Sequence, residues 1–144
     1  MPNKEIDLRI ERLKTVKSAY ILEANASMAR GLEAVAMELF LKAGELELEL
    51  ANLFQSRNDS RNAQVSFLSA GSCLLRAKQY RNARKWLESA AEQFPEAREL
   101  IAQCEGKDDV PLSAATPGLQ ALIGLLVKKK VIEEGEWAEA LAGH

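Results

Sequence analysis

Residues 64–97 decide the fold class, and they read QVSFLSAGSCLLRAKQYRNARKWLESAAEQFPEA. Large and small apolar side chains recur in this stretch at intervals of three and four residues, which is the spacing of one face of a helix. Small side chains let two helices approach closely, and large ones fill the space between them. A proline then closes the pattern, because proline does not continue a helix. The residues expected to form this packing are Phe67, Ala70, Gly71, Leu74, Tyr80, Ala83, Leu87, Ala90 and Pro95.

The same composition extends over most of the chain and predicts an all-α fold. Proline is absent from residues 3 to 94, β-branched residues are scarce there, and good helix formers dominate. Gly44 follows a basic turn and is suited to end a helix, while Asp59 or Ser60 is suited to cap the next one. Short connections make consecutive helices antiparallel. We expect helices near residues 4–26, 30–43, 45–57, 60–77, 80–94, 95–105, 118–130 and 133–142.

A self-comparison predicts that the helices form repeats. A shift of 34 residues superimposes the break at Gly44 on the break at Lys78, and helix-turn-helix units of this period are typical of the tetratricopeptide repeat. Residues 64–97 resemble that repeat closely, whereas residues 30–63 resemble it less well because larger residues stand where small ones are expected. The resemblance implies antiparallel helical hairpins stacked as a short right-handed superhelix with capping helices. A plain helical bundle is the alternative.

The chain is expected to divide into three parts. Residues 1–105 form the helical domain, with an N-terminal capping helix before the two repeats, residues 106–116 form a polar linker, and residues 117–144 form a C-terminal helical hairpin. The hairpin has an apolar stripe at helical spacing. It folds back over the stack or docks on another subunit; a helix on a membrane surface is a third alternative, less favoured because three lysines at one end do not make a basic face. The anchoring candidates for docking are Leu122, Leu126 and Trp137.

Composition excludes several classes of protein. With 47% hydrophobic and 28% charged residues, the chain has the composition of a globular domain. No apolar run reaches the ~18–20 residues that a membrane span needs, and the charged N-terminus lacks a signal-peptide core. We therefore expect a cytoplasmic protein without membrane insertion. Cys73, Cys104 and His144 offer too few ligands for zinc and no catalytic pair, so we expect no cofactor and no enzymatic activity.

Charge is distributed unevenly along the chain. Residues 51–87 carry seven basic side chains against one acidic, while the segments on either side are acidic. One interpretation is an anionic partner, and an acidic protein surface fits better than nucleic acid because only Trp86 is available for base stacking. The other interpretation is a solvated exterior that pairs with the acidic flanks. The basic residues assigned to partner binding are Arg57, Arg61, Arg76, Arg81, Arg84 and Lys85.

These features predict a non-enzymatic adaptor or accessory subunit. The resemblance implies a concave groove that receives a peptide or a helix, and the C-terminal hairpin is a second docking element. One version of the groove grips a C-terminal carboxylate with basic and amide side chains, but Val65, Leu68, Ser69 and Ser72 occupy those positions here. Two alternatives stay open. One is a self-assembling structural protein that forms a homo-oligomer, because two repeats are fewer than usually stand alone; the other is a nucleic-acid-binding regulator that uses the basic residues of 57–85.

Overall fold

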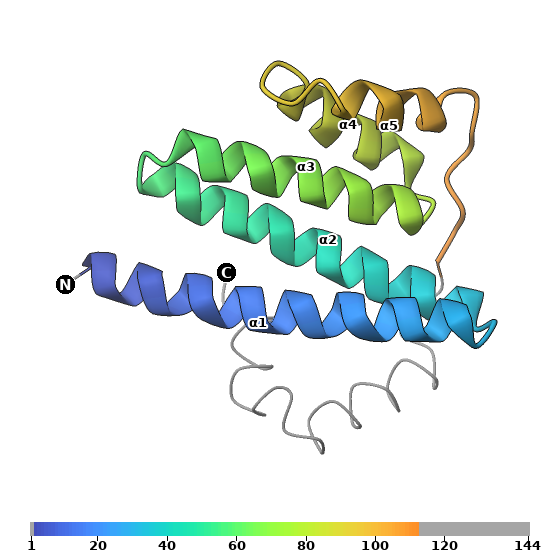
Figure 1. The fold of residues 1–144 in the computed structure, drawn as a ribbon, viewed down its shortest axis with the longest axis horizontal. Helices are drawn as coiled ribbons and strands as arrows, with labels where there is room; N and C mark the ends of the chain where they lie inside the picture. Colours follow the sequence, from blue (N-terminus) through green and yellow to red (C-terminus); the bar gives the residue numbers. More distant parts are fainter. Residues whose placement is uncertain (1, 113–144) are drawn as a thin grey trace.

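The computed structural model describes residues 2–112, which form five helices packed in chain order (Figure 1). Each helix packs chiefly against the next one along the chain. Figure 1 shows α1, α2 and α3 side by side, with α4 and α5 at the opposite edge of the stack from α1. The all-α prediction is therefore confirmed. The helices are α1 (Pro2–Ala29), α2 (Glu33–Ser56), α3 (Ser60–Arg76), α4 (Tyr80–Ala90) and α5 (Ala97–Cys104).

The first three connections are short turns of one type. Each contains a residue in the left-handed conformation, with φ of 77° at Gly31 and 58° at both Asn58 and Lys78. In each turn the backbone N–H of the following residue donates to the carbonyl five residues earlier, which is the geometry of the Schellman motif. Such turns reverse the chain within a few residues and make the helices antiparallel. The three hydrogen bonds join Leu32 to Ser27 at 2.8 Å, Asp59 to Phe54 at 2.9 Å and Gln79 to Leu74 at 2.9 Å.

The break expected at Gly44 is wrong. Gly44 lies inside α2, so the predicted helices 30–43 and 45–57 are one continuous helix. The glycine at position 44 allows close helix packing rather than chain reversal, because a Cβ atom there would lie 3.1 Å from Cγ of Leu74 on α3. Residues 30–63 therefore contain no turn at the position that a 34-residue unit requires. The hairpin that precedes α3–α4 is instead α1–α2.

The α3–α4 hairpin buries most of the residues assigned to its packing. Phe67, Ala70, Gly71 and Leu74 on α3 are buried, as are Ala83, Leu87 and Ala90 on α4. Tyr80 is half-buried at the start of α4. Pro95 is exposed in the connection between α4 and α5, because α4 already ends at Ala90, so it contributes little to this packing. Asp59 caps α3 as expected, accepting from the backbone N–H of Asn62 at 3.2 Å.

Residues 106–112 return from α5 across the stack toward the turn between α1 and α2 (Figure 1). We call this segment the strap. The backbone N–H of Val110 donates to the carbonyl of Lys78 at 3.1 Å, and the Gln79 amide donates to the carbonyl of Val110 at 2.6 Å. The Asp109 carboxylate accepts from the backbone N–H of Arg81 at 2.9 Å. The expected linker 106–116 thus begins as a segment bound to the α3–α4 turn, and residues 113–116 and the hairpin 117–144 lie outside the described residues.

Asp109 supplies the N-terminal cap that α4 lacks locally, since the side chain of Gln79 makes no capping hydrogen bond. We expect Asp109→Ala to lower the free energy of unfolding by about 1 kcal/mol, the usual effect of removing a cap. Chemical denaturation followed by circular dichroism measures it. Asp108→Ala is the matched control and should change stability by less than about 0.5 kcal/mol. Equal losses in the two variants would contradict the capping role.

Candidate functional site

An open groove with a volume of about 590 Å³ lies on one face of the stack, and we call it the basic groove. Because consecutive helices are antiparallel and lie side by side, alternate helices α1, α3 and α5 contribute most of its walls. Single residues of α2 and α4 reach the same surface. The lining residues are Asn25 and Met28 of α1, Phe40 of α2, Ser72, Leu75 and Arg76 of α3, Lys78 of the α3–α4 turn, Tyr80 of α4, Leu100 and Gln103 of α5, and Lys107 of the strap.

The floor of the basic groove is apolar. Phe40 lies deepest, with 4% of its surface exposed. Leu75, Tyr80 and Leu100 are half-buried around it, and Met28 at one edge is 50% exposed. A floor of this kind leaves apolar surface that a ligand could cover, and a flexible methionine adapts to the shape of what binds.

The rim of the basic groove is cationic. The Arg76 guanidinium lies 5.2 Å from the centre of the Phe40 ring, and the Lys107 ammonium lies 5.4 Å from the centre of the Tyr80 ring. Cations held over aromatic faces in this way are positioned without an anionic partner. Arg76 also donates to the Asn25 side-chain oxygen at 3.3 Å. Among residues 2–112, no acidic side chain lines the groove, and neither Arg76 nor Lys107 forms a salt bridge.

Lys78 stands between the basic groove and a second hollow. Its ammonium donates to the Glu33 carboxylate at 2.6 Å, and this hydrogen bond raises the pKa of Lys78 and lowers the pKa of Glu33. Gly31 and Asn58, which tolerate left-handed backbone, occupy the same position in the other two turns. Lysine is strained there, and such strain is concentrated at functional sites. The position of Lys78 thus points to a use for its side chain.

The second hollow, which we call the strap hollow, has a volume of about 660 Å³. The N-terminal part of α2 and the strap line it, and it shares Lys78 with the basic groove. Glu33 and Glu38 supply carboxylates to its wall. The two hollows therefore lie next to each other and differ in charge. Val110, Pro111 and Leu112, the last described residues, form part of this wall.

The basic residues predicted to bind a partner lie on different parts of the stack. Arg76 alone among them lines the basic groove. Arg57 is at the other end of α3, in the turn after α2, and forms an ion pair with Asp7 of α1. Arg61 is exposed on the first turn of α3, also remote from Arg76. The antiparallel turns thus separate residues that are close in sequence.

The basic residues of α4 are also distributed among local contacts. Arg84 forms an ion pair with Glu88 one turn further along the helix, at 2.9 Å, and the Lys85 ammonium lies 4.7 Å from the centre of the Trp86 ring. Arg81 is exposed at the start of the helix. These residues do not join Arg76 in the groove.

The remaining predicted anchors, Leu122, Leu126 and Trp137, lie outside the described residues. Sequence reasoning missed Met28, Phe40, Leu100 and Lys107 as groove residues, because they come from four separate segments and no local pattern links them.

Burial raises the pKa of several side chains among the described residues, including Glu47 and both cysteines. Glu47 is 3% exposed and pairs with Lys17 at 3.4 Å; burial raises the pKa of Glu47, and Lys17 partly offsets this. Burial and the nearby Glu47 raise the pKa of Cys73 to about 11, so this thiol is protonated at neutral pH. Burial also raises the pKa of Cys104. Within residues 2–112, no group of three or more His, Cys, Asp or Glu is arranged to hold a metal ion, and none of the helices there is long and apolar enough to cross a membrane.

Comparisons of the chain with protein-family models, with curated proteins and with solved structures found no match. The functional assignment therefore depends on the geometry of the basic groove and on the chemistry of the residues that line it.

Proposed function

We propose that this protein is a non-enzymatic adaptor or accessory subunit that holds an acidic amphipathic helix of another protein in the basic groove. The observation that supports this is an apolar floor with a rim of Arg76, Lys78 and Lys107, and the described part of the chain places no acidic residue in the lining. An amphipathic helix lays its apolar face into such a groove. Its acidic residues would then meet the rim, where complementary charge favours association and selects the partner.

The state of the rim cations supports an acidic ligand. Arg76 and Lys107 are held over aromatic rings, so neither has to break an ion pair before it meets a carboxylate. A guanidinium binds a carboxylate through two parallel hydrogen bonds, which adds both energy and geometric selectivity. Lys78 would bind a carboxylate of the ligand in place of Glu33 or together with it. The Lys78–Glu33 pair is exposed and contributes little stability by itself.

A protein ligand accounts for the surface better than nucleic acid does. Arg57 and Arg84 are paired with carboxylates of this chain and lie away from the groove, so the basic residues of 57–85 do not form one track for a phosphate backbone. The ring of Trp86 is stacked on Phe67, with centroids 5.1 Å apart and planes 3° from parallel. It is therefore occupied in the stack rather than presented to a base.

The resemblance to the tetratricopeptide repeat belongs to this proposal and applies to the α3–α4 hairpin. That hairpin has the expected order of large and small residues, and the groove beside it is lined mainly by alternate helices. The two free cysteines agree with a cytoplasmic location, where thiols are kept reduced.

Charge reversal at the rim tests the proposal. The probe is a fluorescein-labelled helical peptide of about 16 residues with leucines on one face and glutamates on the other, and its partner peptide has lysines in place of the glutamates. By fluorescence anisotropy the full-length protein should bind the acidic peptide and not the basic one. We expect Arg76→Glu and Lys107→Glu each to weaken binding roughly tenfold or more, and high salt to weaken it further.

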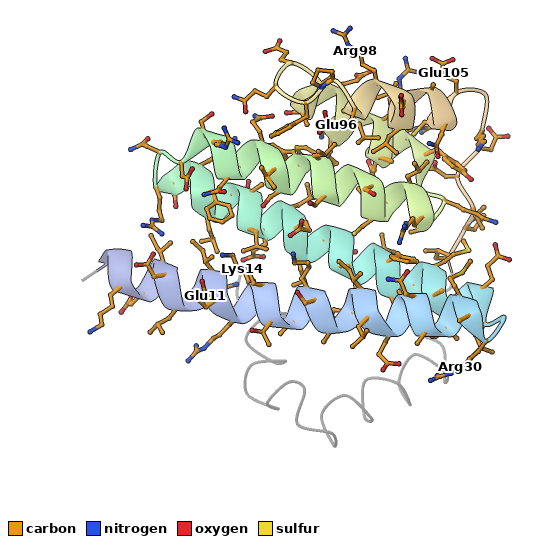
Figure 2. The ribbon with its side chains drawn as sticks, viewed as in Figure 1. Glu11, Lys14, Arg30, Glu96, Arg98 and Glu105 are labelled. Carbon is orange, nitrogen blue, oxygen red and sulfur yellow. The ribbon has the colours of Figure 1, made fainter. Side chains whose placement is uncertain are left out.

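Arg98→Glu is the matched control, because Arg98 points away from the other helices on the outer side of α5 (Figure 2). It should leave the affinity within about twofold of the wild type. Equal weakening by Arg98→Glu, or equal binding of the basic peptide, would show that the groove is not the site.

A further inference from the structure

The chemistry that the basic groove would recognise is present in the chain itself. We propose that the acidic C-terminal segment, residues 131–142, occupies the basic groove of its own chain and competes there with a partner. This inference rests on the proposed function, because it assigns a second occupant to the same groove. It also gives the groove a built-in control over partner binding.

The sequence of residues 131–142 matches the groove in charge and in apolar content. The segment contains no basic residue. Trp137 and Leu141 stand four residues apart, so a helix would place them on one face. A tryptophan is an effective anchor in an apolar pocket. The acidic residues of the segment are Glu133, Glu134, Glu136 and Glu139.

The described chain ends beside the groove. Leu112 lines the strap hollow, which shares Lys78 with the basic groove, and Val110 is hydrogen-bonded to the carbonyl of Lys78. Residues 113–130 connect this point to the acidic segment. A chain of that length reaches roughly 27 Å even if it is wholly helical and roughly 60 Å if it is extended. A short tether of this kind gives the segment a local concentration on the order of millimolar.

We call residues 113–142 the tail. The order of charges along the tail also agrees with the order of the two hollows. Lys128–Lys130 come immediately before the acidic segment. The strap hollow, where the described chain ends, has Glu33 and Glu38 in its wall, and the basic groove lies on the other side of Lys78. Residues 113–127 are long enough to loop out and return, so a tail that holds its glutamates at the cationic rim would place its lysines near the carboxylates of the strap hollow.

Zero-length cross-linking of the wild-type, full-length protein tests the contact directly. A carbodiimide joins an ammonium to a carboxylate only where the two touch, and the products are mapped by mass spectrometry in the monomeric fraction. We expect Lys78 or Lys107 to be joined to glutamates of residues 133–139. Lys14, which lies on α1 (Figure 2) away from the groove, is the internal control and should not be joined to them. Cross-links from the tail only to Lys14 or other lysines, only in dimers, or to no lysine at all would each overturn the proposal.

Competition tests the consequence. In the full-length chain, Glu133→Lys with Glu134→Lys and Glu136→Lys should raise the affinity for the acidic probe peptide roughly tenfold, because the groove is no longer occupied by the tail. The control is Glu96→Lys with Glu105→Lys, two exposed residues beside α5 (Figure 2), which should change it by less than about twofold.

The two proposals can fail separately. The triple variant at Glu133, Glu134 and Glu136 is the tail variant. If Arg76→Glu weakens binding of the acidic probe peptide while the tail variant binds it with the affinity of the wild type, the tail is not the occupant and the proposed function stands. If neither the wild-type protein nor the tail variant binds the acidic probe peptide, the proposed function is wrong.

Discussion

Gly71→Ala is expected to lower the free energy of unfolding by about 2 kcal/mol, although alanine normally stabilises a helix by about 1 kcal/mol relative to glycine. A Cβ atom at position 71 would lie 2.5 Å from Cγ of Leu87 and 3.3 Å from the carbonyl oxygen of Ala83. Leu87 is fully buried, so it cannot rotate into solvent to make room. The new methyl group must therefore push α4 away from α3. Urea denaturation followed by far-ultraviolet circular dichroism measures the loss.

Gly44→Ala is the matched control, because Gly44 contacts the next helix in the same way but less closely. Its Cβ atom would lie 3.1 Å from Cγ of Leu74, so a small shift relieves the contact and the gain in helix propensity offsets the rest. We expect stability within about 0.5 kcal/mol of the wild type. A loss as large as that of Gly71→Ala would show that distance to the neighbouring leucine does not determine the effect.

A double-mutant cycle identifies the cause. Leu87→Ala alone is expected to lower stability by about 2–5 kcal/mol, because it leaves a cavity between α3 and α4. In that background Gly71→Ala should be neutral or stabilising, since the methyl group then enters space that the leucine has left. If Gly71→Ala is equally unfavourable in both backgrounds, overlap with Leu87 is not the reason.

Local sequence predicted those parts of the fold that depend on local interactions. The helical spacing, the cap at Asp59 and the turn at Lys78 all involve residues within a few positions of one another, and the structure has each of them. The alternation of large and small residues over 64–97 also predicted which residues are buried, because α3 and α4 are joined by a short turn. In this part of the chain, sequence neighbours are also packing neighbours.

The errors arose where a local signal has a distant cause. A glycine after a basic turn is suited to end a helix, but Gly44 is small because Leu74 of α3 lies against it. The cap of α4 likewise comes from Asp109, which no pattern around residue 80 indicates. Lys78 adopts a left-handed backbone conformation that lysine disfavours, so its residue type did not indicate this conformation at position 78.

The residues of the basic groove could not be predicted from the sequence. The uneven charge was compatible with an anionic ligand or with a solvated exterior, and of the six basic residues assigned to partner binding only Arg76 lines the groove. The sequence could not show that Arg57 and Arg84 pair with carboxylates elsewhere, because Asp7 is distant along the chain and Glu88 is one of several nearby acids. Phe40 and Lys107 are adjacent to other groove residues only in the folded stack.

Leu13→Ala on α1 is expected to lower the free energy of unfolding of the whole stack by about 3 kcal/mol. Leu13 is 1% exposed, and the inner side of α1 packs along α2. Leu8→Ala on the same helix is the control: its side chain is 54% exposed, so stability should change by less than about 0.5 kcal/mol. The destabilisation should extend to α4, because stacked helices that pack chiefly against their neighbours cannot bury their apolar faces alone.

Two probes distinguish unfolding around α4 from unfolding of the stack as a whole. In a Trp137→Phe background, fluorescence reports on Trp86 of α4, while circular dichroism reports on all helices. Both transitions should move together to lower urea concentration in Leu13→Ala. If the Trp86 transition stays in place while circular dichroism shows an earlier phase, α1 unfolds separately and acts only as a cap. A shared transition would instead tie binding to folding, because Asn25 and Met28 of α1 form one wall of the basic groove. The groove is complete only while α1 is packed, so an acidic ligand should raise the denaturation midpoint of the entire stack.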